Sequence, residues 1–262
     1  DHRATKDTYG QQQEIRLYYD FADVDVDRYM IDGKLTQVFL SARELNQDSL
    51  PEQAKTFNNL MFKYTHGYGL VISPTNKVTD QGMPSYLVQD IPPRSELFKI
   101  NEPRIYFGEL TYNNVIVNSG LMEFDYPLGN DNAENIYEGT KGVRMGFLNK
   151  VFFAFRDMKL KYLLSSYITS ESQYLETRNI RDRAYRIAPF LSYDTDPYLV
   201  LGEDGKLYYI LDAYTSTNRF PYAKAYDETG RFNYLRNSVK ITVDAYTGEI
   251  LFYIADNNDP IV

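Results

Sequence analysis

Two stretches near the end of the chain alternate apolar and polar residues on both sides of a glycine-containing turn. They read YLVLGEDGKLYYILDAY, centred on Asp204-Gly205, and VKITVDAYTGEILFYIAD, which turns at Thr247-Gly248. A period of two is that of a half-buried strand, and such dipeptides connect antiparallel neighbours. A third stretch, VIVNSGLMEFDY, is predicted to form a hairpin around residues 118–120. Hairpins of this kind favour antiparallel sheets over a doubly wound parallel fold.

Helical signals first occur after Ser49. Ser49 and Glu52 have the spacing of a capping box, and Pro51 suits the first turn of a helix. We therefore expect a helix over residues 50–64. It should end at the glycines of YTHGYG, residues 64–69, so that this motif is a helix exit.

A second helical region begins near residue 147. Apolar side chains recur there at helical spacing while Lys150, Asp157 and Lys161 occupy another face, which predicts an amphipathic helix. The recurring residues are Phe147, Val151, Phe155, Met158 and Tyr162.

Another helix is expected after a break near residues 165–170. Ser170 and Gln173 have capping-box spacing, and Pro189 should end this helix. Together the two helices predict a helical hairpin packed on a sheet. The expected fold class is α+β, with antiparallel β-hairpins and sheets packed with that helical hairpin.

The chain has 262 residues, enough to bury a substantial core. No low-complexity tract or long linker divides it, so we expect a single domain over residues 1–262, or two lobes with a boundary near residues 128–146.

Composition excludes several classes of protein. A net charge of −8 argues against a nucleic-acid partner and disfavours contact with an anionic membrane face. The absence of cysteine removes thiol nucleophiles, thiolate metal sites and disulfides. No window approaches the roughly 20 apolar residues of a membrane span. The 25 tyrosines beside zero tryptophans predict sheet faces with half-buried rings and wet hydroxyls, with aromatic platforms for sugars or peptides as the alternative.

His66 is the internal histidine, and the only other one, His2, lies next to the first residue. An enzyme built on a Ser/His/Asp arrangement would have to use His66 as its general base. The sequence contains no GxSxG elbow. The alternative is a hydrogen-bonded structural histidine, and Tyr64 and Tyr68 would share its role, either in a ligand site or in the fold.

Asp23, Asp25 and Asp27 alternate along the chain and resemble the start of a calcium loop. The EF-hand pattern is incomplete, because Lys34 stands at its twelfth position. Calcium is the one possible cofactor that the sequence suggests, and otherwise no cofactor is expected. The alternative is an edge strand with Val24 and its neighbour Val26 inward and the aspartates in water.

Arg178 and Arg181 are expected on one face of the last helix, three residues apart. There they could grip a carboxylate or phosphate, while internal ion pairing is the alternative.

Several segments in order along the chain resemble the uncharacterised protein family 0182 of bacterial membrane proteins. They include RLYYDFADVDVDRYMIDG, KYTHGYGLVISP, RNIRDRAYRIAPFLSYDTDPYLV and FNYLRNSVKITVDAYTGEILFYIADNNDPI. The resemblance implies a multi-pass membrane protein, of which this chain is the extracytoplasmic region at the cell membrane. It carries over no catalytic or ligand-binding residue.

The leading hypothesis is an extracytoplasmic module, without enzymatic activity, that binds or senses a component of the cell envelope. Expected partners are the transmembrane region of its own full-length protein, another envelope protein or a wall polymer. The alternatives are a hydrolase that uses His66 and a calcium-stabilised structural domain.

Overall fold

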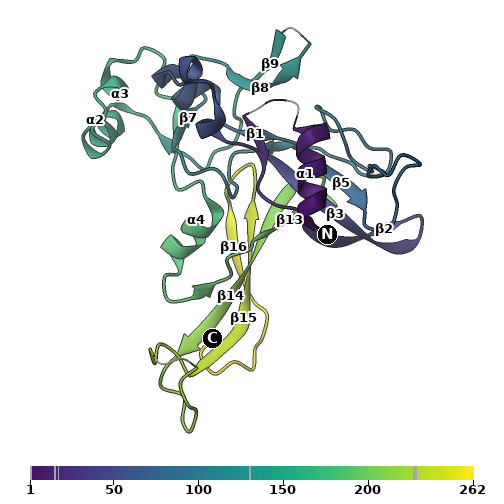
Figure 1. The fold of residues 1–262 in the computed structure, drawn as a ribbon. Coiled ribbons are helices and arrows are strands. Elements are labelled where there is room, and N and C mark those ends of the chain that lie inside the picture. Colours follow the sequence, from purple (N-terminus) through teal and green to yellow (C-terminus); the bar gives the residue numbers. More distant parts are fainter. Residues whose placement is uncertain (1, 15, 17, 130, 227–228) are drawn as a thin grey trace.

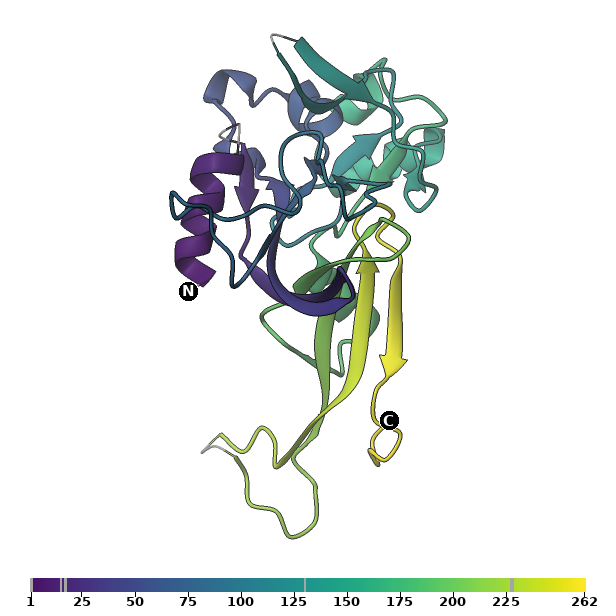
Figure 2. The ribbon, with the colours of Figure 1, turned by 90° about the vertical axis from the view of Figure 1, so that its right-hand side faces the viewer.

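The computed structural model describes residues 2–14, 16, 18–129, 131–226 and 229–262, and it contains both hairpins predicted near the end of the chain. They belong to one antiparallel sheet in which strand order is β12-β14-β15-β16 and β13 pairs with β14. Gly205 and Gly248 occupy the turns with φ of 75° and 69°, a region that favours glycine. The strands are β12 (Ser192–Tyr193), β13 (Tyr198–Leu201), β14 (Leu207–Thr217), β15 (Tyr234–Asp244) and β16 (Ile250–Ile254). Figure 2 shows β14 and β15 extending as a long ribbon away from the rest of the molecule.

A second antiparallel sheet lies near the beginning of the chain. It has the order β1-β3-β2, and β5 also pairs with β3. Asp32 and Gly33 connect β2 to β3 with φ of 51° and 74°, the backbone of a tight hairpin turn. The strands are β1 (Tyr19–Phe21), β2 (Asp25–Ile31), β3 (Lys34–Leu45) and β5 (Leu70–Pro74).

The hairpin predicted for VIVNSGLMEFDY is wrong. Strand β7 (Val115–Val117) pairs with β11 (Gln173–Leu175), which in turn pairs with β10 (Val143–Arg144). Strand β8 (Glu123–Leu128) pairs instead with β9 (Asp131–Asn135). Residues 118–120 are held by another segment, since the Gly120 amide donates to the Tyr167 carbonyl oxygen.

The remaining strand pair is β4 (Gly67–Tyr68) with β6 (Arg104–Ile105).

Part of the loop proposed as a lobe boundary is structured, because β9 and β10 lie within residues 128–146. The choice between one domain and two lobes stays a prediction.

The helix expected over residues 50–64 is not continuous. Short 3-10 turns η1 (Gln47–Ser49) and η2 (Glu52–Ala54) precede the π-helical turn η3 (Asn59–Lys63). Asn46, rather than Ser49, caps the first turn through its side chain, and the side-chain amide of Gln47 donates to the carbonyl oxygens of Leu60 and Tyr64. Side-chain hydrogen bonds to the backbone thus replace a regular helical ladder here.

The amphipathic helix exists as α2 (Phe147–Arg156) but is shorter than expected. Met158 has φ of 53°, so the chain breaks before the short helix α3 (Lys161–Leu164). The next helix also differs, because Gln173 of the predicted capping box lies on strand β11 and helix α4 (Ile180–Ile187) begins only after its N-cap Asn179. Its end, before Pro189, is as predicted.

A further helix, α1 (His2–Gln13), was not predicted and packs beside β1. In the described ranges, no helix is long and apolar enough to cross a bilayer. The mixture of helices and antiparallel sheets confirms the α+β class.

The main core lies between the two larger sheets and is covered by α4. A smaller core joins η3, β7, α2, α3 and β11. Some tyrosines are buried more completely than the expected half-buried rings with hydroxyls in water, since Tyr106 and Tyr209 are fully buried. Their hydroxyls donate to the buried carboxylates of Glu123 and Glu44. Internal acceptors thus take the place of water.

Candidate functional site

The YTHGYG motif is a helix exit, as predicted. Tyr64 terminates η3, and the chain reaches β4 after Thr65 and His66. Gly67 is required by close packing, because a Cβ there would lie 2.5 Å from the Arg43 carbonyl oxygen. Gly69 has φ of 81°. Both glycines therefore serve the backbone path beside β3 rather than an opening for a ligand.

His66 is completely buried between two carboxylates. Its Nε2 lies 3.1 Å from Asp125 Oδ1, and its Nδ1 lies 2.8 Å from Thr65 Oγ1 and 3.4 Å from Glu123 Oε2. The Tyr106 ring packs against the imidazole with 4.5 Å between ring centres.

The hydrogen-bond pattern assigns the protonation of the imidazole. The Thr65 hydroxyl has one hydrogen, which it donates to Glu123 Oε2 at 2.5 Å, so His66 Nδ1 must donate to Thr65. Asp125 already accepts two bonds from Arg104, of 2.8 and 2.9 Å, and can only accept from His66 Nε2. The network therefore holds an imidazolium, with both nitrogens protonated.

Electrostatics agree with this assignment. Burial by itself would lower the pKa of His66, but hydrogen bonds to Asp125 and Glu123 outweigh it and raise that pKa above its ordinary value. Burial would likewise raise the pKa of Asp125, yet its bonds to His66 and Arg104 lower it. An imidazolium has no lone pair with which to accept a proton, so the hydrolase hypothesis gains no support from this arrangement.

Glu123 and Asp125 were missed by the sequence reasoning. They lie two residues apart on β8, and alternate residues of a strand point to the same face. The pattern Glu-x-Asp in a predicted strand could have marked two carboxylates converging on one partner. What the sequence did not reveal is that β8 lies beside β4.

Tyr64 and Tyr68 belong to an aromatic cluster, and their part in a ligand site stays a prediction. The Tyr64 ring packs against Tyr18 and Phe124 at 5.5 and 5.4 Å, and the Tyr68 ring against Tyr126 at 4.8 Å. These side chains support the strands around His66.

Arg178 and Arg181 are not brought together. Arg178 precedes the N-cap of α4 and is buried, with Nη1 donating to the Thr65 carbonyl oxygen, whereas Arg181 is exposed on the helix. Burial lowers the pKa of Arg178 to about 10. The predicted spacing on one helical face fails because α4 begins only at Ile180. Arg178 instead anchors the backbone next to His66.

A polar cavity of about 770 Å³ lies beside α4, and its lining includes Arg178 but not His66. Arg156, which also lines it, forms ion pairs of 2.7 Å with Asp157 and Glu176. Three arginines face three carboxylates around the cavity, so it offers no net charge that would select an anion or a cation.

The three aspartates proposed for calcium face different partners. The buried Asp25 carboxylate accepts the amide of Leu199 on β13, and Asp27 accepts the amide of its neighbour Arg28. Burial, followed by contact with Asp196, raises the pKa of Asp23 to about 7. Burial, followed by the charge of Asp23, raises that of Asp25 to about 8.

No three Asp, Glu, His or Cys side chains in the described part of the chain are placed to hold a metal ion. Calcium binding stays a prediction. The alternative prediction of an edge strand is correct, because β2 lies at the edge of its sheet. The predicted inward and outward positions are wrong at two residues. Asp25 is buried and Val26 is exposed, because Asp25 turns toward β13.

Helix α2 carries an exposed apolar face at the periphery of the molecule (Figure 1). Its contact with the core is made by Phe153, which is 3% exposed and stacks on Tyr174 at 4.4 Å. Phe155, two residues later, is 80% exposed. The apolar face marked by residues 147, 151 and 155 is therefore not the buried one. We call the apolar side chains of this segment that are more than half exposed the α2–α3 surface; they are Phe147, Leu148, Phe152, Phe155, Met158, Leu160 and Leu164.

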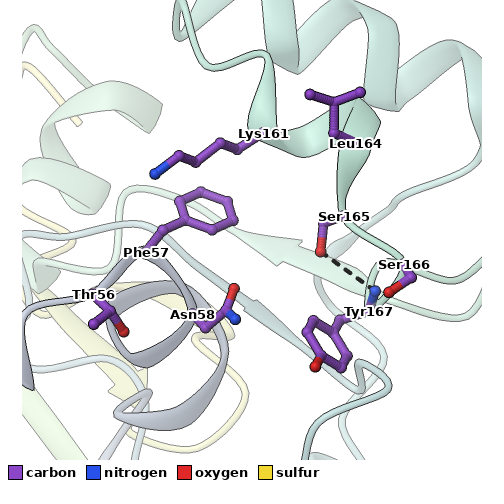
Figure 3. A pocket seen from close by; sticks show the side chains of 8 residues that line it. All are labelled: Thr56, Phe57, Asn58, Lys161, Leu164, Ser165, Ser166 and Tyr167. Atoms are coloured by element: carbon purple, nitrogen blue, oxygen red, sulfur yellow. Dashed lines mark hydrogen bonds between the residues drawn. The ribbon is translucent and has the colours of Figure 1, made fainter.

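A cavity of about 460 Å³ adjoins the α2–α3 surface at Leu164. Figure 3 shows the Lys161 amino group next to the Phe57 ring, at 5.2 Å from its centre. The opposite wall carries Ser166 and Tyr167. The cavity thus combines a cation, hydroxyl groups and aromatic rings beside an exposed apolar helix.

Comparisons with known proteins agree on one family. The family model described as "Uncharacterised protein family (UPF0182)" matches residues 1–262. A UPF0182 protein of Pelotomaculum thermopropionicum is 50% identical over all of this chain and 29% of its own length. One of Desulforamulus reducens is 49% identical, over 100% of the chain and 28% of the relative. The chain therefore spans less than a third of these relatives, and no solved structure matches it significantly.

Proposed function

The chain belongs to the uncharacterised protein family UPF0182, and on that premise we propose that it is a non-enzymatic interaction module of the cell envelope. In this proposal it forms an extracytoplasmic part of a membrane protein and binds through the α2–α3 surface. Its partner belongs to the envelope: the membrane region of its own full-length chain, another envelope protein or a wall polymer.

The α2–α3 surface is the observation that carries the proposal. Phe147, Leu148 and Phe155 are each exposed by more than three quarters and lie on one side of a single helix. Burying such a side chain contributes about 1.5–3 kcal/mol, so leaving several in water is costly. Contiguous apolar patches of this kind mark interaction sites in soluble proteins.

The hydrogen bonds of His66 inside the fold also support the proposal. Its two nitrogens are committed to Asp125 and Thr65 inside the fold, and the side chain is fully buried. The group on which a hydrolase would depend is thus used to hold strands together.

Sedimentation with envelope particles tests the proposal. The purified chain is mixed with washed cell envelopes from a bacterium that encodes the protein, and the bound fraction is measured. We expect binding that falls at least tenfold in the double variant Phe152→Ser/Phe155→Ser, because both side chains are exposed and their loss should leave the fold intact.

A matched control is Leu251→Ser/Tyr253→Ser on β16, where both side chains are about half exposed. This variant should bind like the unchanged chain. Equal binding by both variants, or no binding by the unchanged chain, would refute the proposed function.

A further inference from the structure

We propose that the α2–α3 surface docks onto the surface of an anionic lipid bilayer, with α2 lying parallel to the membrane plane. This inference rests on the proposed function, which is binding to the cell envelope through the α2–α3 surface, and it names the lipid bilayer as the component bound, in place of the protein and wall-polymer partners given there. It follows from the charge around the surface, from the orientation of its side chains and from the cavity beside it.

The charge of the segment is opposite to that of the whole chain. Residues 144–164 contain five basic residues and one acidic residue, a net charge of +4, whereas the whole chain carries −8. Lys159 and Lys161 are exposed, and each lies near an aromatic ring, with no carboxylate at ion-pair distance in the described part of the chain. The net charge of −8, on which the expectation against an anionic membrane rests, therefore does not describe this local segment. Basic residues beside exposed Phe and Leu are typical of helices that lie in a membrane interface.

The side chains are oriented so that insertion leaves the fold unchanged. Phe147, Phe152 and Phe155 project from α2 on the side opposite Phe153, which stays stacked on Tyr174 in the core. The helix has ten residues and is thus about 15 Å long, enough to lay several rings into the headgroup region but not to span a bilayer.

The adjoining cavity supplies a place for a lipid phosphate. Lys161 and the Ser166 hydroxyl line it, and Leu164 connects it to the α2–α3 surface (Figure 3). A phosphate held there would sit at the level of the headgroups while Leu164 faces the acyl chains.

Other occupants fit less well. A second copy of this chain would bring two segments with an excess of basic residues together, which charge repulsion opposes. An acidic protein would match the charge, but the exposed apolar side chains belong to a helix at the periphery of the molecule (Figure 1). Exposed rings suit a soft, deformable partner.

Binding to protein-free vesicles tests the inference. The chain is incubated with vesicles of phosphatidylcholine alone or of phosphatidylcholine mixed with phosphatidylglycerol, an anionic lipid whose surface potential attracts basic residues. We expect at least tenfold tighter partitioning to the anionic vesicles, weakened by raised salt because screening shortens the reach of the lysines.

Three variants separate the contributions. Phe152→Ser/Phe155→Ser should reduce partitioning about tenfold or more by removing inserted rings. Each of Lys159→Gln and Lys161→Gln should reduce it about fivefold, in anionic vesicles only. The control Leu251→Ser/Tyr253→Ser should partition like the unchanged chain.

Each outcome decides a different point. Two results would show that the partner is a protein: binding to envelopes through the α2–α3 surface without binding to anionic vesicles, or loss of binding after proteolysis of the envelopes. Either result would overturn the lipid inference and leave the proposed function standing. If vesicles are bound and the control variant loses binding equally, the site is misplaced. Failure with both envelopes and vesicles overturns both proposals.

Discussion

His66 and Asp125 form an ion pair of 3.1 Å in which both side chains are buried. The pair joins the residue that precedes β4 to β8, and Arg104 also donates to the Asp125 carboxylate. Buried charges of this kind are stable only while each retains its partner.

Replacing His66 should therefore be strongly destabilising. His66→Asn removes the positive charge between Glu123 and Asp125, and we expect a loss of about 3–5 kcal/mol in the free energy of unfolding. Urea titration followed by circular dichroism measures it. The exposed Arg181→Gln is the control, expected within about 0.5 kcal/mol of the unchanged chain. A loss below 1 kcal/mol for His66→Asn would contradict the assigned imidazolium.

Stability should decline as pH rises through the neutral range. Burial raises the pKa of Asp25 to about 8, above its ordinary value of about 3.9, so the folded state holds the proton more tightly. The resulting stabilisation is complete below about pH 4 and is lost as pH rises to about 8. The raised pKa of His66 acts in the same direction.

Thermal melting between pH 5.5 and 8.5 tests this dependence. Asp25→Asn keeps an oxygen that can accept the Leu199 amide but cannot ionise, so its melting temperature should fall less with pH than that of the unchanged chain. The exposed Asp48→Asn serves as the charge-matched control. Parallel pH profiles for the unchanged chain and Asp25→Asn would show that Asp25 is not the titrating group.

Two phenylalanines on α2 should differ sharply in their contribution to stability. Phe153→Ala removes a buried ring and should cost about 3–5 kcal/mol. Phe155→Ala removes an exposed ring and should change the free energy of unfolding by less than about 0.5 kcal/mol. Denaturant titration of both variants provides the comparison, and similar losses would mean that the exposed face is covered.

Chelation should leave the melting temperature unchanged. The Asp25 carboxylate is already bonded to the Leu199 amide, and its raised pKa favours the neutral form, which is a poor ligand for calcium. Melting with excess EDTA and with millimolar calcium measures the effect. A melting temperature that falls with EDTA and recovers with calcium would establish the calcium-stabilised domain instead.

The sequence predicted best where partners are close along the chain. Hairpins at Asp204-Gly205 and Thr247-Gly248 formed as expected, since turn residues and strand alternation act over a few residues. The same pattern at residues 118–120 misled, because Val117 pairs with Gln173, far away in the sequence. Turn residues act locally, so they do not indicate whether a strand from a distant part of the sequence will pair there instead.

Helical periodicity was informative about α2 but not about its environment. The spacing of Phe147 and Phe155 indicated correctly that they share a face. It did not indicate which face packs on the core, because both faces of α2 carry aromatic residues. In the structure, Phe153 is the aromatic residue of α2 that packs on the core. The exposed surface on which both proposals rest was therefore invisible in the sequence.

By itself the sequence determined the α+β class, the two local hairpins and the family, since these follow from short-range pattern and from residue identity. Only the tertiary structure decided that YTHGYG is built into the fold. It brings Glu123 and Asp125 of β8 to either side of His66, and so turns the sole internal imidazole into a buried cation. Burial and charge pairing arise between segments distant in sequence, and they settle what each side chain can do.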